Sequence, residues 1–212
     1  KLCAYLIKIS FFQQKNSKKK NSKKIILVLY RAIGERDINI VKESSNKIPQ
    51  IFFMRRSIVK LIFYFFSGKK KIFFNYSKPG LNFTHEDYFN QSEKNKARMD
   101  TFWIDVINNL KNIYKNKILE LVTFNCNYQA EFSLYAGCKE NNIPVKLWFK
   151  ECFRSDPGTE WFIKDARDKY FNVFHLFQKI SVYNKSMKNA LIKVNKSNRK
   201  KITVNGCPRI FD

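Results

Sequence analysis

The chain has few of the residues, and none of the motifs, that mark metal or cofactor chemistry. It contains only 6 glycines and 2 histidines in 212 residues. It shows no glycine-rich phosphate loop, no Walker motif, no Ser-His-Asp order and no paired metal ligands. The 5 cysteines have no C-x-x-C spacing, which argues against a zinc site or a disulfide framework and fits a reducing cytoplasm. We therefore expect no metal and no resident cofactor.

Long apolar runs are also missing. A helix that spans a membrane needs about 20 consecutive apolar residues, and the apolar stretch at residues 58–66 is much shorter. This stretch reads IVKLIFYFF, with Arg55 and Arg56 before it and three lysines after Gly68. The pattern leaves two interpretations, a helix that lies in a membrane interface and a core helix that ends at Gly68.

Acidic residues are scarce compared with basic ones. There are 17 Asp and Glu against 41 Lys and Arg, which gives a formal net charge of +24. Lysine accounts for 32 of the basic residues, and 22 Asn and 21 Phe accompany it; all three have AT-rich codons, so genome composition can supply much of the charge. Otherwise the charge favours an anionic membrane surface or anionic substrates. Nucleic acid is disfavoured as a partner, because the basic residues are scattered and no RNA- or DNA-binding motif occurs.

The composition predicts one folded domain with a basic extension. The chain is 44% hydrophobic and 16% aromatic, which is typical of a globular protein, and its length suffices for one core. Residues 13–24 carry six lysines and no apolar side chain. We expect residues 1–24 to be a basic tail or linker, with a phosphate- or lipid-binding arm as the alternative, and residues 25–212 to form the domain. Because the sequence begins with Lys rather than Met, we expect it to be part of a longer chain.

Apolar patterns predict alternating strands and helices. Strands are expected at residues 25–30, 49–54, 72–76, 118–124, 145–149, 179–183 and 201–204, and helices at 58–66, 92–116, between Asn127 and Asn142, and after Asn184. This alternation is typical of an α/β fold, here a Rossmann-like three-layer α/β/α arrangement with a mainly parallel sheet. In the helix after Asn127, a stripe of small residues should let the helix lie close to the sheet; it comprises Ala130, Leu134, Gly137 and Cys138.

The segment 117–155 places polar side chains after two neighbouring parallel strands. The carboxyl ends of parallel strands lie at the same edge of a sheet, and open α/β sheets bind their ligands there. We therefore expect one crevice to be lined by Asn125, Asn127, Tyr128, Lys150, Glu151, Arg154 and Asp156.

The last part of the chain carries a recognisable order of motifs. They are N-x-x-Y-x-x-E at residues 125–131, NIPVKLWFKE at 142–151 and VNGCPRIFD at 204–212. Over residues 117–212 this order resembles the amino-terminal half of GT-B-type glycosyltransferases, specifically bacterial surface- or capsular-polysaccharide biosynthesis proteins. In that two-domain architecture the second domain holds most nucleotide-sugar contacts, and this sequence ends where that domain would begin.

The resemblance implies transfer of a sugar from a nucleotide-activated donor to a saccharide or lipid-linked acceptor, in the cytoplasm at the inner face of the cell membrane. It implies Glu151 as the base or substrate-binding carboxylate, with Lys150 and Arg154 stabilising charge. The implied substrate-binding residues are Asn125, Asn127, Tyr128 and Asp156, and a turn at the interdomain hinge would contain Gly206, Pro208 and Arg209.

Several alternatives stay open at this point. Lys150 and Glu151 could form a structural ion pair at a strand end. A polyol-phosphate transferase or a sugar epimerase of similar two-domain build is a neighbouring enzyme class. The remaining alternatives are a basic binding module for anionic lipid or nucleic acid, and an inactive fragment.

Overall fold

The computed structural model describes residues 11–13, 23–29, 38, 50–67, 88, 91–115, 117–124, 126, 129–149, 163–164 and 173–206. Its strands are β1 Phe11–Gln13, β2 Lys24–Leu29, β3 Gln50–Met54, β4 Ile118–Thr123, β5 Val145–Trp148, β6 Lys179–Val182 and β7 Ile202–Val204. Its α-helices are α3 Arg56–Ser67, α5 Glu93–Ile113, α6 Phe132–Glu140 and α8 Lys185–Val194, and its short 3-10 helices are η1 Gln129–Glu131, η2 Phe174–Leu176 and η3 Lys196–Lys200. The strands expected around residues 25, 50, 120, 147, 181 and 203 are confirmed, whereas the strand expected at 72–76 lies outside the described residues.

The strands form one seven-stranded sheet in the order β1-β3-β2-β4-β5-β6-β7. Every neighbouring pair from β3 to β7 is parallel, and β1 pairs with β3 in the antiparallel direction. β1 lies within the stretch expected to be a tail or linker, so that stretch contributes a strand to the sheet edge. The division of the chain into domains stays a prediction.

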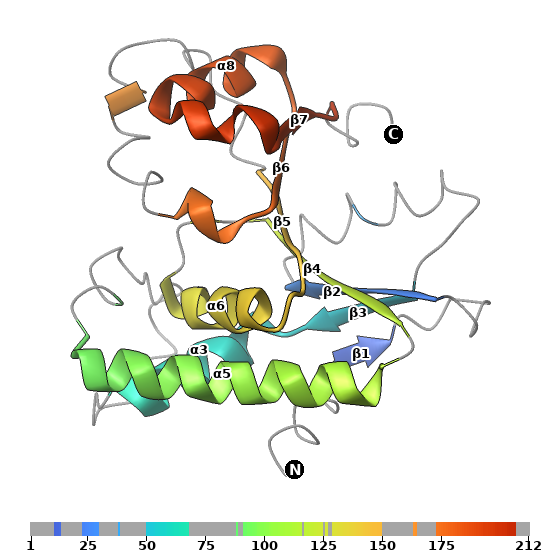
Figure 1. Ribbon diagram of the computed structural model, residues 1–212, viewed down its shortest axis with the longest axis vertical. Helices are drawn as coiled ribbons and strands as arrows, with labels where there is room; N and C mark the ends of the chain where they lie inside the picture. Colours follow the sequence, from blue (N-terminus) through green and yellow to red (C-terminus); the bar gives the residue numbers. More distant parts are fainter. Residues whose placement is uncertain are drawn as a thin grey trace, which may run out of the picture.

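The order of the parallel strands reverses at β2. The chain runs from β2 to β3 in one direction along the sheet, and then from β4 through β7 in the other. Since crossovers between parallel strands are right-handed, the two directions place their connections on opposite faces. Figure 1 shows α3, α5 and α6 together on one side of the sheet.

Side-chain burial confirms a core on each face. On β2, Ile25 and Leu27 belong to the same core as Trp103 of α5, whereas Val28 packs with Ile38 on the other face. Residues alternate in this way because successive side chains of a strand point to opposite faces. The protein therefore has the expected α/β, Rossmann-like fold, and Ile38 is the described residue that covers the second face.

Helices α5 and α6 pack tightly against each other. Ser92 caps α5 by accepting a hydrogen bond from the Asn95 backbone N–H, as its short polar side chain allows. Gly137 of α6 lies against the backbone of α5, where a Cβ atom would come within 2.8 Å of the Trp103 carbonyl carbon. Within the stripe of residues expected to face the sheet, Gly137 allows α6 to approach α5, while Leu134 and Cys138 belong to the core that also contains sheet residues.

Helix α3 is buried on one side only. Val59 and Phe63 are buried, whereas the side chains of Leu61 and Phe65 are 49% and 73% exposed. The buried side fits the core-helix interpretation of residues 58–66, and contact with a membrane interface stays a prediction. In the part of the chain that the structure describes, no helix combines the length and the apolar character needed to cross a membrane.

Candidate functional site

The carboxyl edge of the parallel sheet is the candidate site, because ligands of open α/β sheets bind where the strand order reverses. Here the reversal falls between β2 and β4, which are parallel neighbours. β3 leads directly into α3, and β4 leads into η1 and α6. The beginnings of these two helices therefore lie at the edge of the sheet, on either side of the end of β2.

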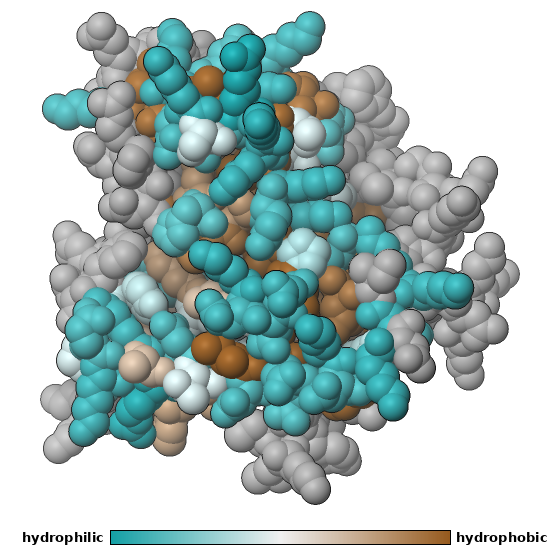
Figure 2. Space-filling model, viewed as in Figure 1, coloured by the Kyte–Doolittle hydropathy of each residue, from teal (hydrophilic) through white to brown (hydrophobic). Residues whose placement is uncertain are grey.

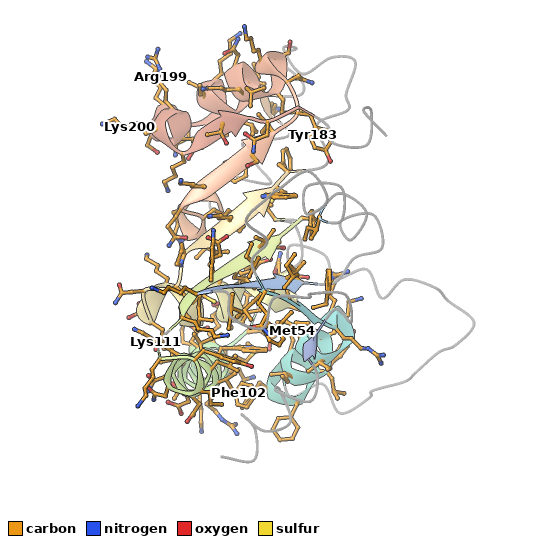
Figure 3. The ribbon with its side chains drawn as sticks, turned by 90° about the vertical axis from the view of Figure 1, so that its right-hand side faces the viewer. Met54, Phe102, Lys111, Tyr183, Arg199 and Lys200 are labelled. Carbon is orange, nitrogen blue, oxygen red and sulfur yellow. The ribbon has the colours of Figure 1, made fainter. Side chains whose placement is uncertain are left out.

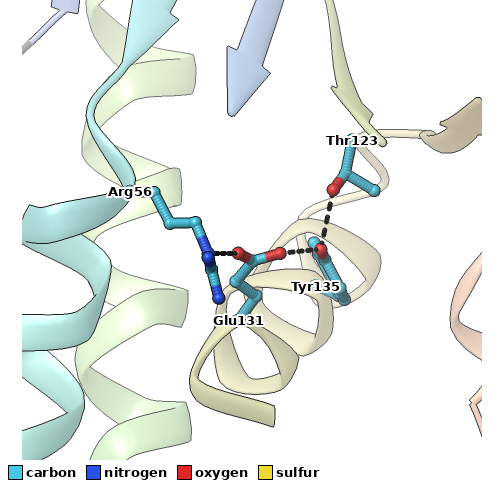
Figure 4. Close-up of polar contacts among 4 residues, drawn as sticks. All are labelled: Arg56, Thr123, Glu131 and Tyr135. Atoms are coloured by element: carbon cyan, nitrogen blue, oxygen red, sulfur yellow. Dashed lines mark hydrogen bonds and ion pairs between the residues drawn. The ribbon is translucent and has the colours of Figure 1, made fainter. Parts of the chain in front are cut away.

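A buried chain of polar side chains connects the starts of α3 and α6 (Figure 4). Arg56, the first residue of α3, donates from Nε to Glu131 Oε1 at 2.6 Å. The other oxygen, Oε2, accepts a hydrogen bond from the Tyr135 hydroxyl at 2.6 Å. That hydroxyl also lies 3.0 Å from Oγ1 of Thr123, the last residue of β4. Since Tyr135 has one proton, which the carboxylate attracts most strongly, Thr123 is the donor in the second contact.

Burial sets the chemistry of this cluster. Glu131 is 1% exposed and Tyr135 is fully buried. Burial, followed by the charge of Glu131, raises the pKa of the Tyr135 hydroxyl well above its usual value, so this tyrosine is a hydrogen-bond donor at neutral pH. Both oxygens of Glu131 are engaged, and the carboxylate is closed to solvent. The cluster therefore positions the helix starts at the sheet edge, and it offers no free base.

Further contacts hold the turn before α6. The backbone N–H of Tyr88 donates to Gln129 Oε1 at 2.5 Å, and the ring of Tyr88 lies edge-on to that of Phe132 at 5.6 Å. Burial, followed by the charge of Asp100, raises the pKa of Tyr88 to about 12. Arg56 and Tyr88 are far apart in the chain, and both form hydrogen bonds to residues of η1.

A second buried carboxylate lies on the opposite face of the sheet. Glu120 of β4 is 5% exposed and forms ion pairs with Lys24 of β2 at 3.0 Å and Lys146 of β5 at 2.5 Å. The two lysines neutralise a charge that burial would otherwise penalise. This triad ties three adjacent strands together at a distance from their carboxyl ends.

Most residues expected at the site lie outside the described residues. They are Asn125, Asn127, Tyr128, Lys150, Glu151, Arg154, Asp156, Pro208 and Arg209. The described residues next to them are Phe124 after β4 and Phe149 after β5, and these two strands are parallel neighbours. Phe124 packs edge-on against Trp148 with ring centroids 5.8 Å apart. The roles assigned to the nine residues stay predictions.

Gly206 is the described member of the expected turn after β7. Its φ angle is 71°, a left-handed conformation that glycine adopts without steric cost. The backbone conformation therefore favours glycine here, while its position at an interdomain hinge stays a prediction.

Sequence reasoning missed Arg56, Thr123, Tyr135 and Glu120 as members of buried clusters, although it had singled out Glu131. Two signals were present. An arginine at the start of a helix lies at the positive end of the helix dipole, which is unfavourable for a cation. A carboxylate nearby offsets this repulsion. Glu120 interrupts the apolar strand ILELVT, and a charge inside a buried strand needs partners.

No group of three or more His, Cys, Asp or Glu residues within the described ranges could hold a metal ion. The thiols of Cys126 and Cys138 are buried and are not joined in a disulfide, and burial raises the pKa of Cys138 above that of an ordinary thiol. A thiol held in this protonated state is a poor nucleophile.

Together the sheet order and the helix starts define an α/β protein with a Rossmann-like fold. No protein-family model and no curated protein matches the sequence. Among solved structures, the chain is similar to S. aureus MnaA in a co-structure with UDP, at 12% identity and a TM-score of 0.46, over 88% of this chain and 45% of that one. It is also similar to UDP-GlcNAc 2-epimerase from Neisseria meningitidis bound to UDP-GlcNAc, at 12% identity and a TM-score of 0.45, over 87% of this chain and 46% of that one. The chain thus spans about half the length of both proteins. The fold class rests on the strand order and register of the protein itself.

Proposed function

We propose that this chain is the acceptor-side domain of a nucleotide-sugar-dependent glycosyltransferase of bacterial surface- or capsular-polysaccharide biosynthesis. Two lines support the proposal. One is the order of motifs over residues 117–212, and the other is the parallel sheet whose strand order reverses at β2. Such a sheet binds ligands at its carboxyl edge.

One structural observation carries the proposal. β4 and β5 are adjacent and parallel, with Leu121 opposite Val145 and Thr123 opposite Leu147. The motif at residues 125–131 begins just after β4, and the motif at residues 142–151 contains β5 and ends with Lys150 and Glu151 shortly after that strand. Their functional residues would then share one edge of the sheet, which is the arrangement that a two-motif acceptor site requires.

In the proposed reaction, Glu151 deprotonates the acceptor hydroxyl as it attacks the sugar carbon of the donor. Lys150 and Arg154 neutralise the nucleoside diphosphate as it leaves. Asn125, Asn127, Tyr128 and Asp156 orient the acceptor through its hydroxyl groups. The Arg56–Glu131–Tyr135 cluster holds η1 and the start of α6, which come directly after Asn125, Asn127 and Tyr128 in the sequence.

The proposal is tested with the complete natural protein, incubated with a panel of nucleotide sugars and lipid-linked or saccharide acceptors. We expect a glycosylated product and free nucleoside diphosphate. Replacing Glu151→Gln should lower the rate by about 10²–10⁴, the usual contribution of a general base. The matched control is Glu140→Gln, because Glu140 is exposed at the end of α6 and its replacement should leave the rate unchanged.

Each result has a defined meaning. Equal rates for Glu151→Gln and the unmodified protein would remove Glu151 from the mechanism. If the donor sugar is isomerised and no acceptor is modified, the protein catalyses epimerisation rather than glycosyl transfer. Transfer of a polyol phosphate would identify the third enzyme class that the motifs allow.

A further inference from the structure

Residues 173–206 contain no Asp or Glu. They comprise η2, β6, α8, η3 and β7, and they lie at one end of the molecule in Figure 1. Eight cationic side chains belong to this segment, and we call them the basic surface: Lys179, Lys185, Lys188, Lys193, Lys196, Arg199, Lys200 and Lys201.

The concentration of charge distinguishes this segment from the central part of the chain, residues 93–140. Residues 93–140, which contain α5, β4 and α6, carry seven cations and six carboxylates, a net charge of +1 in 48 residues. Residues 173–206 carry eight cations and no carboxylate, a net charge of +8 in 34 residues. A genome-wide preference for lysine codons would act equally on both segments. It therefore does not explain the difference between them.

The fold turns these cations outward. The buried side of α8 is apolar and consists of Met187, Ala190, Leu191 and Val194. Lys185 and Lys193 lie away from that buried side and are exposed, and in η3, which follows α8, Lys196, Arg199 and Lys200 are exposed. Figure 2 shows hydrophilic side chains projecting from this end of the molecule, and Figure 3 shows Arg199 and Lys200 pointing away from the sheet.

The basic surface has no acidic partner within the described part of the chain. The ion pairs found there join Lys24, Arg56, Lys96 and Lys146 to carboxylates, and none involves the eight cations of the basic surface. Like charges repel one another, and a bound anion would lower that repulsion.

The kind of anion follows from the side chains. Seven of the eight cations are lysines, which act as mobile point charges and lack the planar fork that arginine uses on phosphodiesters and bases. The exposed positions of α8 and η3 are filled by Lys, Arg, Ser and Asn, without an aromatic ring on which a base could stack. We expect such a surface to bind a flat layer in which negative charge is spread over many groups, as it is in a layer of anionic lipid headgroups.

We propose that the basic surface of α8 and η3 docks the protein onto an anionic phospholipid membrane. The contact is electrostatic and lies at the headgroups, since no large apolar residue of α8 or η3 is exposed. This inference rests on the charge distribution and is independent of the proposed enzymatic activity.

The test is sedimentation of the protein with phosphatidylcholine vesicles that contain or lack phosphatidylglycerol. We expect binding only to the anionic vesicles, and weaker binding as the salt concentration rises. Each lysine near an anionic surface strengthens binding about fivefold. The triple variant Lys185→Gln, Lys193→Gln, Lys200→Gln should therefore bind about a hundredfold more weakly.

A second triple variant controls for total charge. Lys94, Lys115 and Lys139 are exposed residues of the balanced segment, and replacing all three with Gln changes the net charge by the same amount. This variant should bind anionic vesicles nearly as well as the unmodified protein. Equal losses for the two variants would overturn the proposal, because binding would then follow total charge alone.

Two further results would also overturn it. One is equal binding to neutral and anionic vesicles. The other is preferential binding to duplex or single-stranded nucleic acid when this competes with the vesicles, with the α8–η3 variant losing that binding. Circular dichroism of both variants shows whether α8 keeps its structure, so that a loss of binding is assigned to charge rather than unfolding.

Discussion

Arg56 and Glu131 are 75 positions apart in the sequence and meet in a buried ion pair. Their side chains are 17% and 2% exposed. A carboxylate buried to this degree is stable only with a cation and further hydrogen-bond donors, which Arg56 and Tyr135 supply. At the residue scale, this pair joins the helix that follows β3 to the 3-10 turn that follows β4, and these two strands flank β2.

Replacing Arg56→Met should destabilise the protein by about 3–5 kcal/mol, the usual cost of leaving one member of a buried pair alone. The double variant with Glu131→Gln should recover part of this loss, because the charge is then gone. Urea unfolding of the two single variants and the double variant measures the coupling energy. The comparison is Glu93→Gln at the exposed Lys96–Glu93 pair, which should cost less than about 1 kcal/mol. Equal costs at the two sites would mean that the Arg56–Glu131 pair is no stronger than a surface contact.

Tyr135 predicts a dependence of stability on alkaline pH. Its pKa is raised in the folded protein, whereas in the unfolded chain it is about 10. The folded state therefore retains a proton that the unfolded state loses above pH 10, and the stabilisation present below that pH decreases as the pH rises further. The free energy of unfolding, measured by urea between about pH 9 and pH 11, should fall less steeply for Tyr135→Phe than for the unmodified protein. Identical slopes would show that this hydroxyl does not contribute.

At the scale of elements, the contact between α5 and α6 decides how the helix layer lies on the sheet. The backbone of α6 comes so close to α5 at Gly137 that a Cβ atom would be 2.9 Å from the Trp103 carbonyl oxygen. Trp103 is itself 1% exposed, so α5 has little freedom to move away. A glycine in the middle of a helix is kept here at the expense of helix propensity.

Gly137→Ala should therefore destabilise the protein by about 1–3 kcal/mol, as overpacking does in rigid cores. The sign of the effect is decisive, because the same substitution at an uncrowded helical position stabilises by about 0.5–1 kcal/mol. Thermal or urea unfolding measures it. A gain in stability would mean that the two helices can separate without loss.

Other helices obey local rules. Asn184 caps α8 by accepting a hydrogen bond from the Met187 backbone N–H at 2.7 Å, as its position before an apolar stripe predicts. Asn142 ends the α6 connection with a φ angle of 57°, a conformation that asparagine tolerates better than most residues. These boundaries depend on neighbours within a few positions, and sequence patterns predicted them well.

At the scale of the whole molecule, strand order and charge distribution carry the functional proposals. The reversal at β2 places the candidate site between the halves of the sheet. The basic surface lies with α8 at the end of the molecule opposite α5 (Figure 1). An enzyme that used both features would hold a nucleotide sugar and its acceptor at the sheet edge while the basic surface kept it at the membrane.

The sequence by itself determined the class of fold and the position of nearly every described strand and helix. Apolar runs, helical periodicity and capping residues act over a few neighbouring positions, so their pattern can be read without knowledge of the rest of the chain. The tertiary structure alone decided the order of the strands, the pairing of Arg56 with Glu131, the lysines around Glu120 and the partner of Gly137. These depend on which distant segments come together, and a pattern of neighbouring residues holds no information about that.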